Sequence, residues 1–326
     1  MRDGIGRRID YLRISVIDKC NLRCTYCMPV GGLDWIPKPE ILTYEEITAI
    51  VREMAGMGLR RLRLTGGEPL VRQDLPILVE QLRGIPEIED ISLSTNAILL
   101  PRFAADLRLA GVDRVNISLD TLKRDRFESI ARRPARIFDE TMAGIEAAER
   151  VGFSPLKINT VLLRGLNDDE VGEFAALTRS RPWHVRFIEL MPVGENLHLA
   201  DRFIGADEVL GRIAGIANLL PDAGPDGNGP ARYFRYPGAP GTVGVITPLS
   251  HNYCDSCNRV RLTADGRLRT CLFGSHEVDL KTPLRRTGTV RAMVERALQE
   301  KPERHMLVHG SDAGSGGLEA LSQVGG

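Results

Sequence analysis

Short β-prone runs alternate with stretches of helical periodicity through the first two-thirds of the chain, and this alternation limits the possible folds more than any other feature. The β-prone runs cover 11–18, 62–67, 90–96, 114–120, 157–163 and 184–190, and amphipathic helical patterns such as 45–58 and 138–152 lie between them. A strand followed by a helix, repeated in this way, predicts parallel strands joined by right-handed crossovers. Periodicity alone leaves open whether the sheet is an open doubly wound one or curls toward a barrel.

Polar residues stand where these β-prone runs end. GGEP (66–69) follows the second run, STN (94–96) closes the third, Ser118 and Asp120 close the fourth, and Met191 follows the sixth. Enzymes built on parallel barrels assemble their active sites at the carboxyl ends of the strands. The pattern therefore favours a barrel-like sheet with a site at that end.

The composition changes in the last third of the chain. A passage rich in glycine and proline (221–241) predicts a loop or hairpin, and we expect a domain boundary near 195–205, dividing the chain into 1–200 and 201–326. Three short β-prone runs and a helix (289–302) follow. The composition of the last residues (310–326) predicts a flexible end.

Charge and hydropathy exclude little about the substrate but bear on location. The chain of 326 residues has 43 Lys and Arg against 43 Asp and Glu, so no global field attracts nucleic acid or a membrane surface. No apolar stretch is long enough to span a bilayer, and the first residues lack the apolar run of a secretory signal. We expect a cytoplasmic protein that binds neither nucleic acid nor membrane.

Six cysteines form two groups of three, and in a reducing compartment such tight spacing favours metal ligation over disulfides. The first group, Cys20, Cys24 and Cys27, follows the first predicted strand directly. Three thiolates can hold a four-iron cluster by three corners and leave one iron open to a small molecule. A zinc site would need a fourth ligand from a distance, such as His184 or His251.

The second group comprises Cys254, Cys257 and Cys271, again without a fourth cysteine. His251 and His276 lie close enough in sequence to complete a tetrahedral zinc site. On ligand count alone, zinc and a second open four-iron cluster are equally good interpretations.

The first group resembles the signature of the radical S-adenosylmethionine (SAM) superfamily. The segment DKCNLRCTYCMP has the superfamily's cysteine spacing with an aromatic residue, Tyr26, before the last cysteine, and TGGEPL (65–70) supports the match. The resemblance implies an α/β fold, an incomplete parallel (β/α)6 barrel, with a [4Fe–4S] cluster on Cys20, Cys24 and Cys27. The SAM-binding residues it implies are Tyr26, Gly66, Gly67, Glu68, Ser118 and Met191.

The second group extends the resemblance to one family, the GTP 3′,8-cyclases of molybdenum cofactor biosynthesis. The shared features are Cys-x2-Cys-Asn-Arg-x-Arg (254–261), the distant Cys271, the segments INTVLL and RFIELMP, and the terminal Gly325-Gly326. The resemblance implies a lyase that cyclises GTP through a 5′-deoxyadenosyl radical, with a β-rich C-terminal extension that carries a second [4Fe–4S] cluster. Two departures from the family's usual residues are Ser94, in place of threonine, and Ala97, in place of glycine.

The family resemblance also implies roles for individual residues. GTP is expected between the two clusters, with its guanine at the open iron of the second one. Arg259, Arg261 and the Gly325-Gly326 tail are expected to assist the radical steps. The residues expected to bind GTP are Arg13, Arg63, Ser94, Lys157, Arg259 and Arg261.

The resemblance also implies partners for the protein, and two other interpretations of the sequence compete with it. The resemblance implies an electron donor, a homodimer, and transfer of the product to cyclic pyranopterin monophosphate synthase. One alternative is a twin-cluster radical SAM enzyme that modifies a peptide, although such enzymes generally carry more C-terminal cysteines. Another is a zinc-stabilised nucleic-acid-binding module, against which the neutral charge and the lack of interleaved aromatic residues count.

Overall fold

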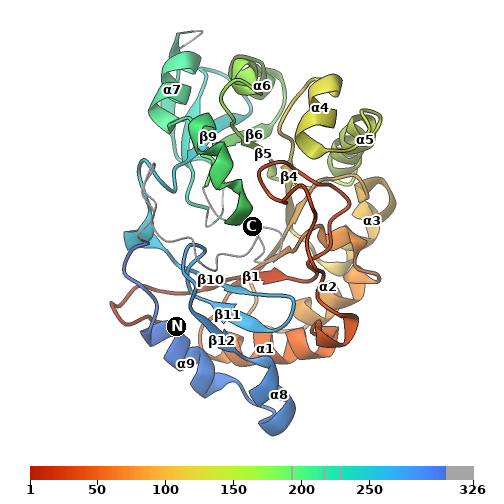
Figure 1. The fold of residues 1–326 in the computed structure, drawn as a ribbon, viewed down its shortest axis with the longest axis vertical. Coiled ribbons are helices and arrows are strands. Elements are labelled where there is room, and N and C mark those ends of the chain that lie inside the picture. Colours follow the sequence, from red (N-terminus) through yellow and green to blue (C-terminus); the bar gives the residue numbers. More distant parts are fainter. Residues whose placement is uncertain (192–193, 216–217, 226, 228, 306–326) are drawn as a thin grey trace.

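The strands of the protein form one continuous sheet in the computed structural model, which describes residues 1–191, 194–215, 218–225, 227 and 229–305 (Figure 1). The described strands number 12, in the order β12-β11-β10-β1-β2-β3-β4-β5-β6-β9-β8-β7. Their bounds are β1 Tyr11–Ser15, β2 Arg61–Thr65, β3 Asp90–Thr95, β4 Arg114–Ser118, β5 Leu156–Val161, β6 Trp183–Ile188, β7 Leu220–Asp222, β8 Arg232–Arg235, β9 Thr242–Ile246, β10 Arg259–Leu262, β11 Arg267–Arg269 and β12 Glu277–Asp279.

The central six strands are the six predicted from the sequence. Each of β1 to β5 pairs in parallel with the next strand along the chain. The sheet curls around a central space without β7 and β12 pairing to close it. The predicted incomplete parallel (β/α)6 barrel is confirmed.

Helices cover the outer face of this sheet. The α-helices are α1 Tyr44–Gly56, α2 Leu75–Arg83, α3 Leu100–Ala110, α4 Arg124–Ala131, α5 Ile137–Arg150, α6 Val171–Ser180, α7 Ala206–Ala214, α8 Lys281–Thr287 and α9 Arg291–Gln299. Short 3-10 helices are η1 Lys38–Glu40, η2 Pro69–Val71, η3 Asp168–Glu170, η4 Gly194–Arg202 and η5 Cys254–Ser256. The two predicted helices, 45–58 and 138–152, correspond to α1 and α5.

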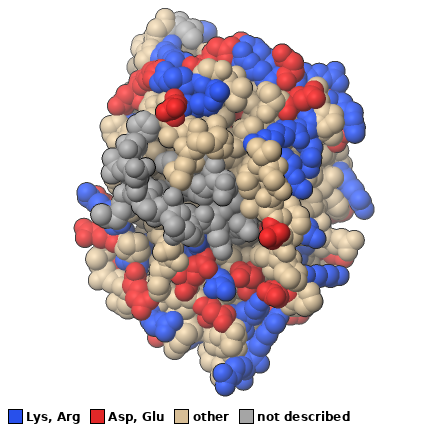
Figure 2. Space-filling view, viewed as in Figure 1, with Lys and Arg blue, Asp and Glu red and all other residues tan. Residues whose placement is uncertain are grey.

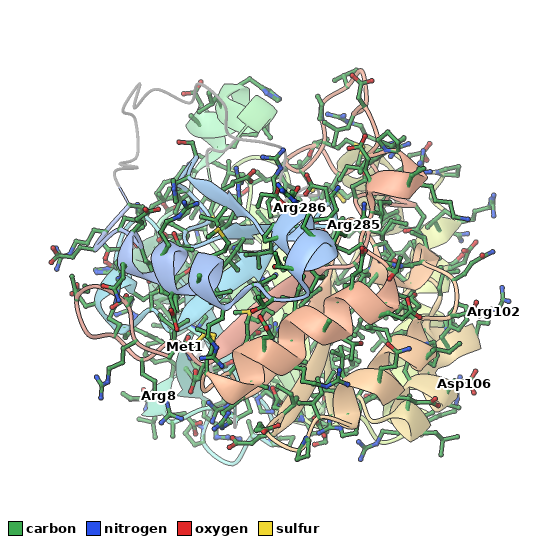
Figure 3. The ribbon with its side chains drawn as sticks, turned by 90° about the horizontal axis from the view of Figure 1, so that it is seen from below. Met1, Arg8, Arg102, Asp106, Arg285 and Arg286 are labelled. Atoms are coloured by element: carbon green, nitrogen blue, oxygen red, sulfur yellow. The ribbon has the colours of Figure 1, made fainter. Side chains whose placement is uncertain are left out.

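Helix α1 shows how local sequence fixes an element. Thr43 and Glu46 form a reciprocal capping box that satisfies two of the amide groups left unpaired at the helix start. The face that carries Ile47, Ile50 and Met54 is buried against the sheet. On the outer side Arg285 of α8 donates to the Glu46 carboxylate at 2.6 Å, and Figure 3 shows α8 beside α1 with Arg285 labelled.

The last third of the chain extends the sheet at both edges. Strand β9 pairs in parallel with β6, and the Gly- and Pro-rich passage forms the predicted hairpin from β7 and β8. Strand β10 pairs in parallel with β1, and β11 and β12 follow antiparallel. The predicted β-rich extension is therefore confirmed, and its strands flank the barrel rather than standing apart from it.

Charged side chains of both signs are interspersed over the face in Figure 2. No helix among the described residues is long and apolar enough to cross a membrane. Inside the barrel the charge balance is different, because several arginines point into the central space from strands whose alternate residues form the apolar core. On β1, for example, Leu12 and Ile14 are fully buried in the core, whereas Arg13 faces the centre.

Candidate functional site

A cavity of about 260 Å³ occupies the centre of the barrel. It is lined by residues from β1 to β6, from the loops at their carboxyl ends, and from β10. Fourteen of the residues to which the family resemblance gives a role lie on its wall: Arg13, Cys20, Cys24, Tyr26, Cys27, Arg63, Gly66, Gly67, Glu68, Ser94, Ser118, Met191, Arg259 and Arg261.

The two cysteine groups lie toward opposite ends of this cavity. Cys20 comes after the carboxyl end of β1, whereas Cys257 comes just before the amino end of β10. These strands are parallel neighbours, with Tyr11 opposite Arg259 and Arg13 opposite Arg261. A strand of five residues is about 16 Å long. A ligand reaching both cysteine groups must therefore extend through the barrel.

The first cysteine group forms a compact loop whose thiols influence one another. Burial raises the pKa of Cys20 to about 11, and the charge of Glu68 acts in the same direction. Burial also raises the pKa of Cys24, with Asp120, Cys27 and Cys20 adding to the effect. Thiolates are the form that binds iron, so loading a cluster here must release protons.

Three arginines hold this loop through its main-chain carbonyls. Arg133 Nε donates to Asn21 O at 2.7 Å, Arg132 Nη1 to Met28 O at 3.1 Å, and Arg23 Nη1 to Cys20 O at 3.4 Å. The loop is thereby attached to the end of α4, where Arg23 N also donates to Ala131 O. These hydrogen bonds give the three cysteines a fixed frame.

The predicted GGEP turn packs backbone against backbone on the segment that leads into the cysteine loop. Gly67 N donates to Ile17 O at 2.8 Å and Glu68 N to Lys19 O at 2.9 Å. A Cβ on Gly66 would lie 2.3 Å from Ile17 O, and one on Gly67 would lie 2.3 Å from Lys19 O. Glycine is required here because the two chains approach too closely for any side chain.

Glu68 is almost completely buried, at 2% exposure, and its carboxylate organises two neighbouring strand ends. It accepts hydrogen bonds from Asn96 N at 2.7 Å, Thr95 Oγ1 at 2.8 Å and Leu70 N at 3.1 Å. Burial nevertheless raises its pKa to about 7. Its position between the two strand ends fits a role in shaping the cofactor edge of the cavity.

Tyr26 is held by Asp120, a cavity-lining residue at the end of β4. The Tyr26 hydroxyl donates to Asp120 Oδ2 at 2.7 Å, and Val161 N donates to Asp120 Oδ1 at 2.9 Å. Burial raises the pKa of Asp120 to about 6. Tyr26 is thereby fixed on the wall between two of the cysteines.

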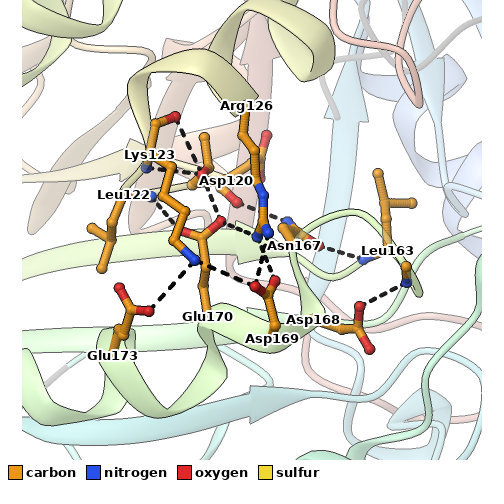
Figure 4. A network of polar contacts seen from close by, with 12 residues as sticks. Asp120, Leu122, Lys123, Arg126, Leu163, Asn167, Asp168, Asp169, Glu170 and Glu173 are labelled. Atoms are coloured by element: carbon orange, nitrogen blue, oxygen red, sulfur yellow. Dashed lines mark hydrogen bonds and ion pairs between the residues drawn. The ribbon is translucent and has the colours of Figure 1, made fainter.

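A polar network behind Asp120 fixes the turn that carries it (Figure 4). Asn167 Nδ2 donates to Asp120 O at 2.7 Å. The fully buried Glu170 accepts from Thr121 Oγ1 and from Leu122 N, each at 2.7 Å, and from Arg126 Nη1 at 2.8 Å. The loop before α6 therefore fixes the position of the turn after β4, which carries Asp120.

Arginines dominate the wall between the two cysteine groups. Arg13, Arg63 and Arg261 have lowered pKa values because of burial, which for Arg261 brings the pKa to about 10, and neighbouring positive charges add to the effect. The ring of Tyr11 packs against two of the wall arginines, with its centre 5.7 Å from the Arg63 guanidinium and 5.8 Å from that of Arg259. Crowded buried cations of this kind have the charge that a polyanion would neutralise.

Lys157 lies off the cavity wall, although Ser94 is on it. Its burial, together with the charges of Arg186, Arg114 and Arg63, lowers its pKa to about 6. The chain at Gly227 passes close by, because a Cβ there would lie 3.0 Å from Lys157 Nζ. Lys157 nevertheless lies in register with Ser94, because each of them pairs with Asn116 of β4.

The second departure from the family pattern, Ala97, has a structural explanation. Its φ of 67° is in the left-handed region that glycine adopts readily. Gly144 in α5 packs directly on it, since a Cβ on Gly144 would lie 1.9 Å from Ala97 O. Ala97 thus adopts a conformation that costs an alanine roughly 1–2 kcal/mol, and its methyl group is buried in the core rather than on the cavity wall.

The second cysteine group lies just outside the cavity wall, to which its chain neighbours Tyr253 and Leu272 contribute. Burial raises the pKa of Cys254, and the charges of Cys271 and Cys257 act against its ionisation, as expected for thiols gathered together. Both histidines of the zinc interpretation are engaged elsewhere. His251 Nε2 lies 2.9 Å from Asp207 Oδ2, and His276 Nε2 lies 3.0 Å from Glu300 Oε2.

Within the described part of the chain, no three His, Cys, Asp or Glu side chains converge closely enough to share a single metal ion. The residues that line the cavity fit an iron–sulfur cluster and large ligands instead. Three cysteines lie at one end of the cavity beside Gly66 and Gly67, and arginines line its length. The predicted tail residues Gly325 and Gly326 lie outside the described residues.

Sequence reasoning missed several residues of the wall. Asn159, Arg186, Tyr11 and Tyr253 line the cavity, and Arg186 Nε donates to Asn159 Oδ1 at 2.8 Å. Alternation along β5 and β6 could have indicated the first two, because polar residues at alternate positions of parallel strands must face a polar interior. Lys301, close to the second cysteine group, gave no recognisable signal.

Comparison with known proteins gives matches over nearly the whole chain. Residues 14–178 match the model of the Radical SAM superfamily, and residues 183–307 match the family Molybdenum Cofactor Synthesis C. The chain is 50% identical to the GTP 3′,8-cyclase of Pelotomaculum thermopropionicum, covering 95% of this chain and 96% of that one. It is 46% identical to the GTP 3′,8-cyclase of Moorella thermoacetica, with full coverage of both.

A solved structure shares the fold at much lower identity. Streptococcus suis SuiB bound to S-adenosylmethionine aligns with a TM-score of 0.60 at 14% identity, covering 84% of this chain and 64% of SuiB. At this identity the likeness is evidence of the fold alone.

Proposed function

The chain belongs to the GTP 3′,8-cyclase family of radical SAM enzymes, and we propose here which of its residues carry out the family's reaction. The enzyme converts GTP to (8S)-3′,8-cyclo-7,8-dihydroguanosine 5′-triphosphate, the first step of molybdenum cofactor biosynthesis, and uses SAM and two [4Fe–4S] clusters. When bound, the cofactors would supply a 5′-deoxyadenosyl radical that takes the hydrogen from C3′ of GTP. The C3′ radical would add to C8 of the guanine, and the nitrogen-centred radical so formed would take up one electron and one proton. The protein's contribution is to position the reactants and to exclude competing reactions.

The carboxyl end of the barrel is proposed as the SAM end. Cys20, Cys24 and Cys27 would hold the first cluster, leaving its open iron to face the cavity. Six further wall residues would bind SAM: Tyr26, Gly66, Gly67, Glu68, Ser118 and Met191. The close packing of the glycines on residues 17–19 would keep the cofactor edge and the cluster loop in fixed register.

The amino end is proposed as the GTP end, with Cys254, Cys257 and Cys271 holding the second cluster. The single observation that supports this most is the row of buried arginines on the wall between the two cysteine groups. Guanidinium groups pair bidentately with phosphate oxygens, so a triphosphate suits them. The proposed GTP-binding residues are Arg13, Arg63, Ser94, Lys157, Arg259 and Arg261, with Lys157 reaching the phosphates from below the wall.

Two arginines of β2 offer a matched test. Arg63 lies on the wall, and Ser92 Oγ is the partner of its Nε at 3.2 Å, whereas Arg61 donates to Asp10 Oδ2 at 2.8 Å. Arg63→Met should weaken GTP binding roughly 10- to 150-fold, because a hydrogen bond to a charged group contributes about 1.5–3 kcal/mol. Arg61→Met should leave GTP affinity unchanged in equilibrium titrations of the cluster-loaded enzyme. Equal GTP affinity in wild type and Arg63→Met would contradict the proposed phosphate site.

We also propose roles for the two halves of the chain and for its terminal glycines. Residues 1–200 would serve the first cluster and SAM, and 201–326 the second cluster and the tail. Gly325 and Gly326 would enter the cavity and assist the radical steps together with Arg259 and Arg261. Deleting both glycines should abolish cyclisation while leaving the clusters and GTP binding intact, and full product formation by the truncated enzyme would refute that role.

Cellular partners remain part of the proposal. The reaction needs an electron donor, and its product would pass to cyclic pyranopterin monophosphate synthase. A homodimer is proposed from family membership. A reducing, cytoplasmic location is proposed as well, because cysteines that serve as cluster ligands must not be oxidised to disulfides.

A further inference from the structure

Lys301 has a buried ammonium group at the end of the segment that follows α9. It is only 5% exposed. Its Nζ donates to Arg259 O at 3.2 Å and to Thr270 O. Figure 1 shows α9 beside β12, and α9 also contacts β11, the strand that leads to Cys271.

The two carbonyls that Lys301 binds flank the second cysteine group. Thr270 immediately precedes Cys271, and Arg259 is two residues after Cys257. Through these two bonds the buried ammonium ties together the segments that carry Cys257 and Cys271.

No carboxylate among the described residues forms an ion pair with Lys301 within 4 Å. Its neighbours differ in this respect. Arg7 donates to Cys254 O at 2.8 Å but is paired with Asp3 at 2.6 Å, and Arg304 is paired with Asp255 at 3.0 Å. A buried charge without a counter-charge is strongly unfavourable, so a native structure that retains one normally supplies an anion from elsewhere.

The group expected beside Lys301 has the required charge. Three thiolates outweigh the positive charge of an oxidised four-iron core, and each added electron makes the cluster more negative. Reduction potentials of such clusters depend on their net charge and on nearby hydrogen bonds and charges. We propose that Lys301 is the counter-charge of the second iron–sulfur cluster, stabilising its negative charge and raising its reduction potential; this rests on the two-cluster assignment above.

The proposal assigns the effect on the cluster to the charge of Lys301 and not to its hydrogen bonds, and Lys301→Gln distinguishes the two. Glutamine can still donate to a main-chain carbonyl but carries no charge. Lys281→Gln is a matched control, because Lys281 Nζ likewise donates to a main-chain carbonyl, Glu40 O at 2.9 Å. Lys281 lies beside Gly266, at the end of β11 opposite to the one that leads to Cys271. Lys301→Arg restores a positive charge and should restore the wild-type behaviour.

Two quantities are measured on anaerobically reconstituted enzyme. One is the iron content, and the other is the midpoint potential of each cluster, obtained by redox titration monitored by electron paramagnetic resonance. For Lys301→Gln we expect the second cluster alone to change, by a more negative midpoint potential or by loss of its iron, with Lys301→Arg closer to wild type and Lys281→Gln unchanged. Wild-type iron content and midpoint potentials in Lys301→Gln would overturn the proposal and make Lys301 a structural tether.

The same samples distinguish this inference from the proposed function. If wild-type enzyme takes up iron for one cluster only, the two-cluster assignment fails, and the Lys301 inference fails with it. If wild type holds both clusters and Lys301→Gln matches it in both potentials, only the Lys301 inference fails. A change in both clusters of Lys301→Gln would indicate a general loss of structure and would also overturn it.

Discussion

The closest backbone approach at the cofactor edge gives the sharpest prediction, the effect of Gly67→Ala. The new Cβ would lie 2.3 Å from Lys19 O and 2.4 Å from Asp18 O, where ordinary contact begins near 3.4 Å. Both obstacles are main chain, so the segment must move by roughly 1 Å, and Lys19 immediately precedes Cys20. A displacement of about 1 Å at reacting groups can cost about 100-fold in rate. We expect Gly67→Ala to cleave SAM about 100-fold more slowly.

The assay is the rate of 5′-deoxyadenosine formation by anaerobically reconstituted enzyme with excess reductant, alongside iron content and the thermal midpoint. Overpacking of this kind typically costs 1–3 kcal/mol of stability, so the variant should still fold at assay temperature. Gly31→Ala is the matched control, because no atom lies within 4 Å of its new Cβ. A Gly67→Ala enzyme that cleaves SAM as fast as Gly31→Ala would refute the claim that this packing sets the register of SAM and cluster.

Three further predictions address other parts of the site. Cys24→Ala should abolish SAM cleavage, whereas Cys257→Ala should retain uncoupled cleavage to 5′-deoxyadenosine but yield no cyclised product; mass spectrometry of both variants tests this, and normal product from Cys257→Ala would contradict it. Since the pKa of Lys157 is lowered to about 6, it is mostly neutral at a pH of about 7.5, and a bound triphosphate should raise that pKa and draw in a proton. Calorimetry in buffers of different ionisation enthalpy should therefore show proton uptake by wild type that Lys157→Met lacks, and equal uptake by both would remove Lys157 from the site. Tyr26→Phe removes the donor to Asp120 at 2.7 Å and should lower the free energy of unfolding by about 1 kcal/mol, measured by denaturant titration, whereas unchanged stability would show that Asp120 does not depend on Tyr26.

The fold was predictable where one repeated pattern governs it. All six parallel strands follow from alternation of β-prone and helical segments, and the polar strand ends predicted the side of the sheet where Cys20, Gly67 and Ser118 meet. The resemblance added what periodicity does not contain, a second cysteine group in a β-rich extension. The pairing of β1 with a strand more than 240 residues later in the chain was not predicted and is seen only in the folded chain.

What the sequence could not provide is depth within the barrel. Lys157 and Ser94 looked alike as strand residues and lie in register through Asn116, but only Ser94 lines the cavity. Asp120 was visible as a polar strand end, yet its bond to Tyr26 joins residues 94 positions apart. Lys301 lies in an unremarkable polar segment, and only the folded chain brings it to Thr270 and Arg259.

The central claim is that this cavity holds SAM and GTP together for cyclisation. The most direct test is anaerobic incubation of the reconstituted enzyme with SAM, dithionite and GTP, following 5′-deoxyadenosine and the nucleotide product by mass spectrometry. The account predicts that 5′-deoxyadenosine and 3′,8-cyclo-7,8-dihydro-GTP form together. Formation of 5′-deoxyadenosine without any GTP-derived product would contradict the GTP site and redirect attention to a peptide substrate.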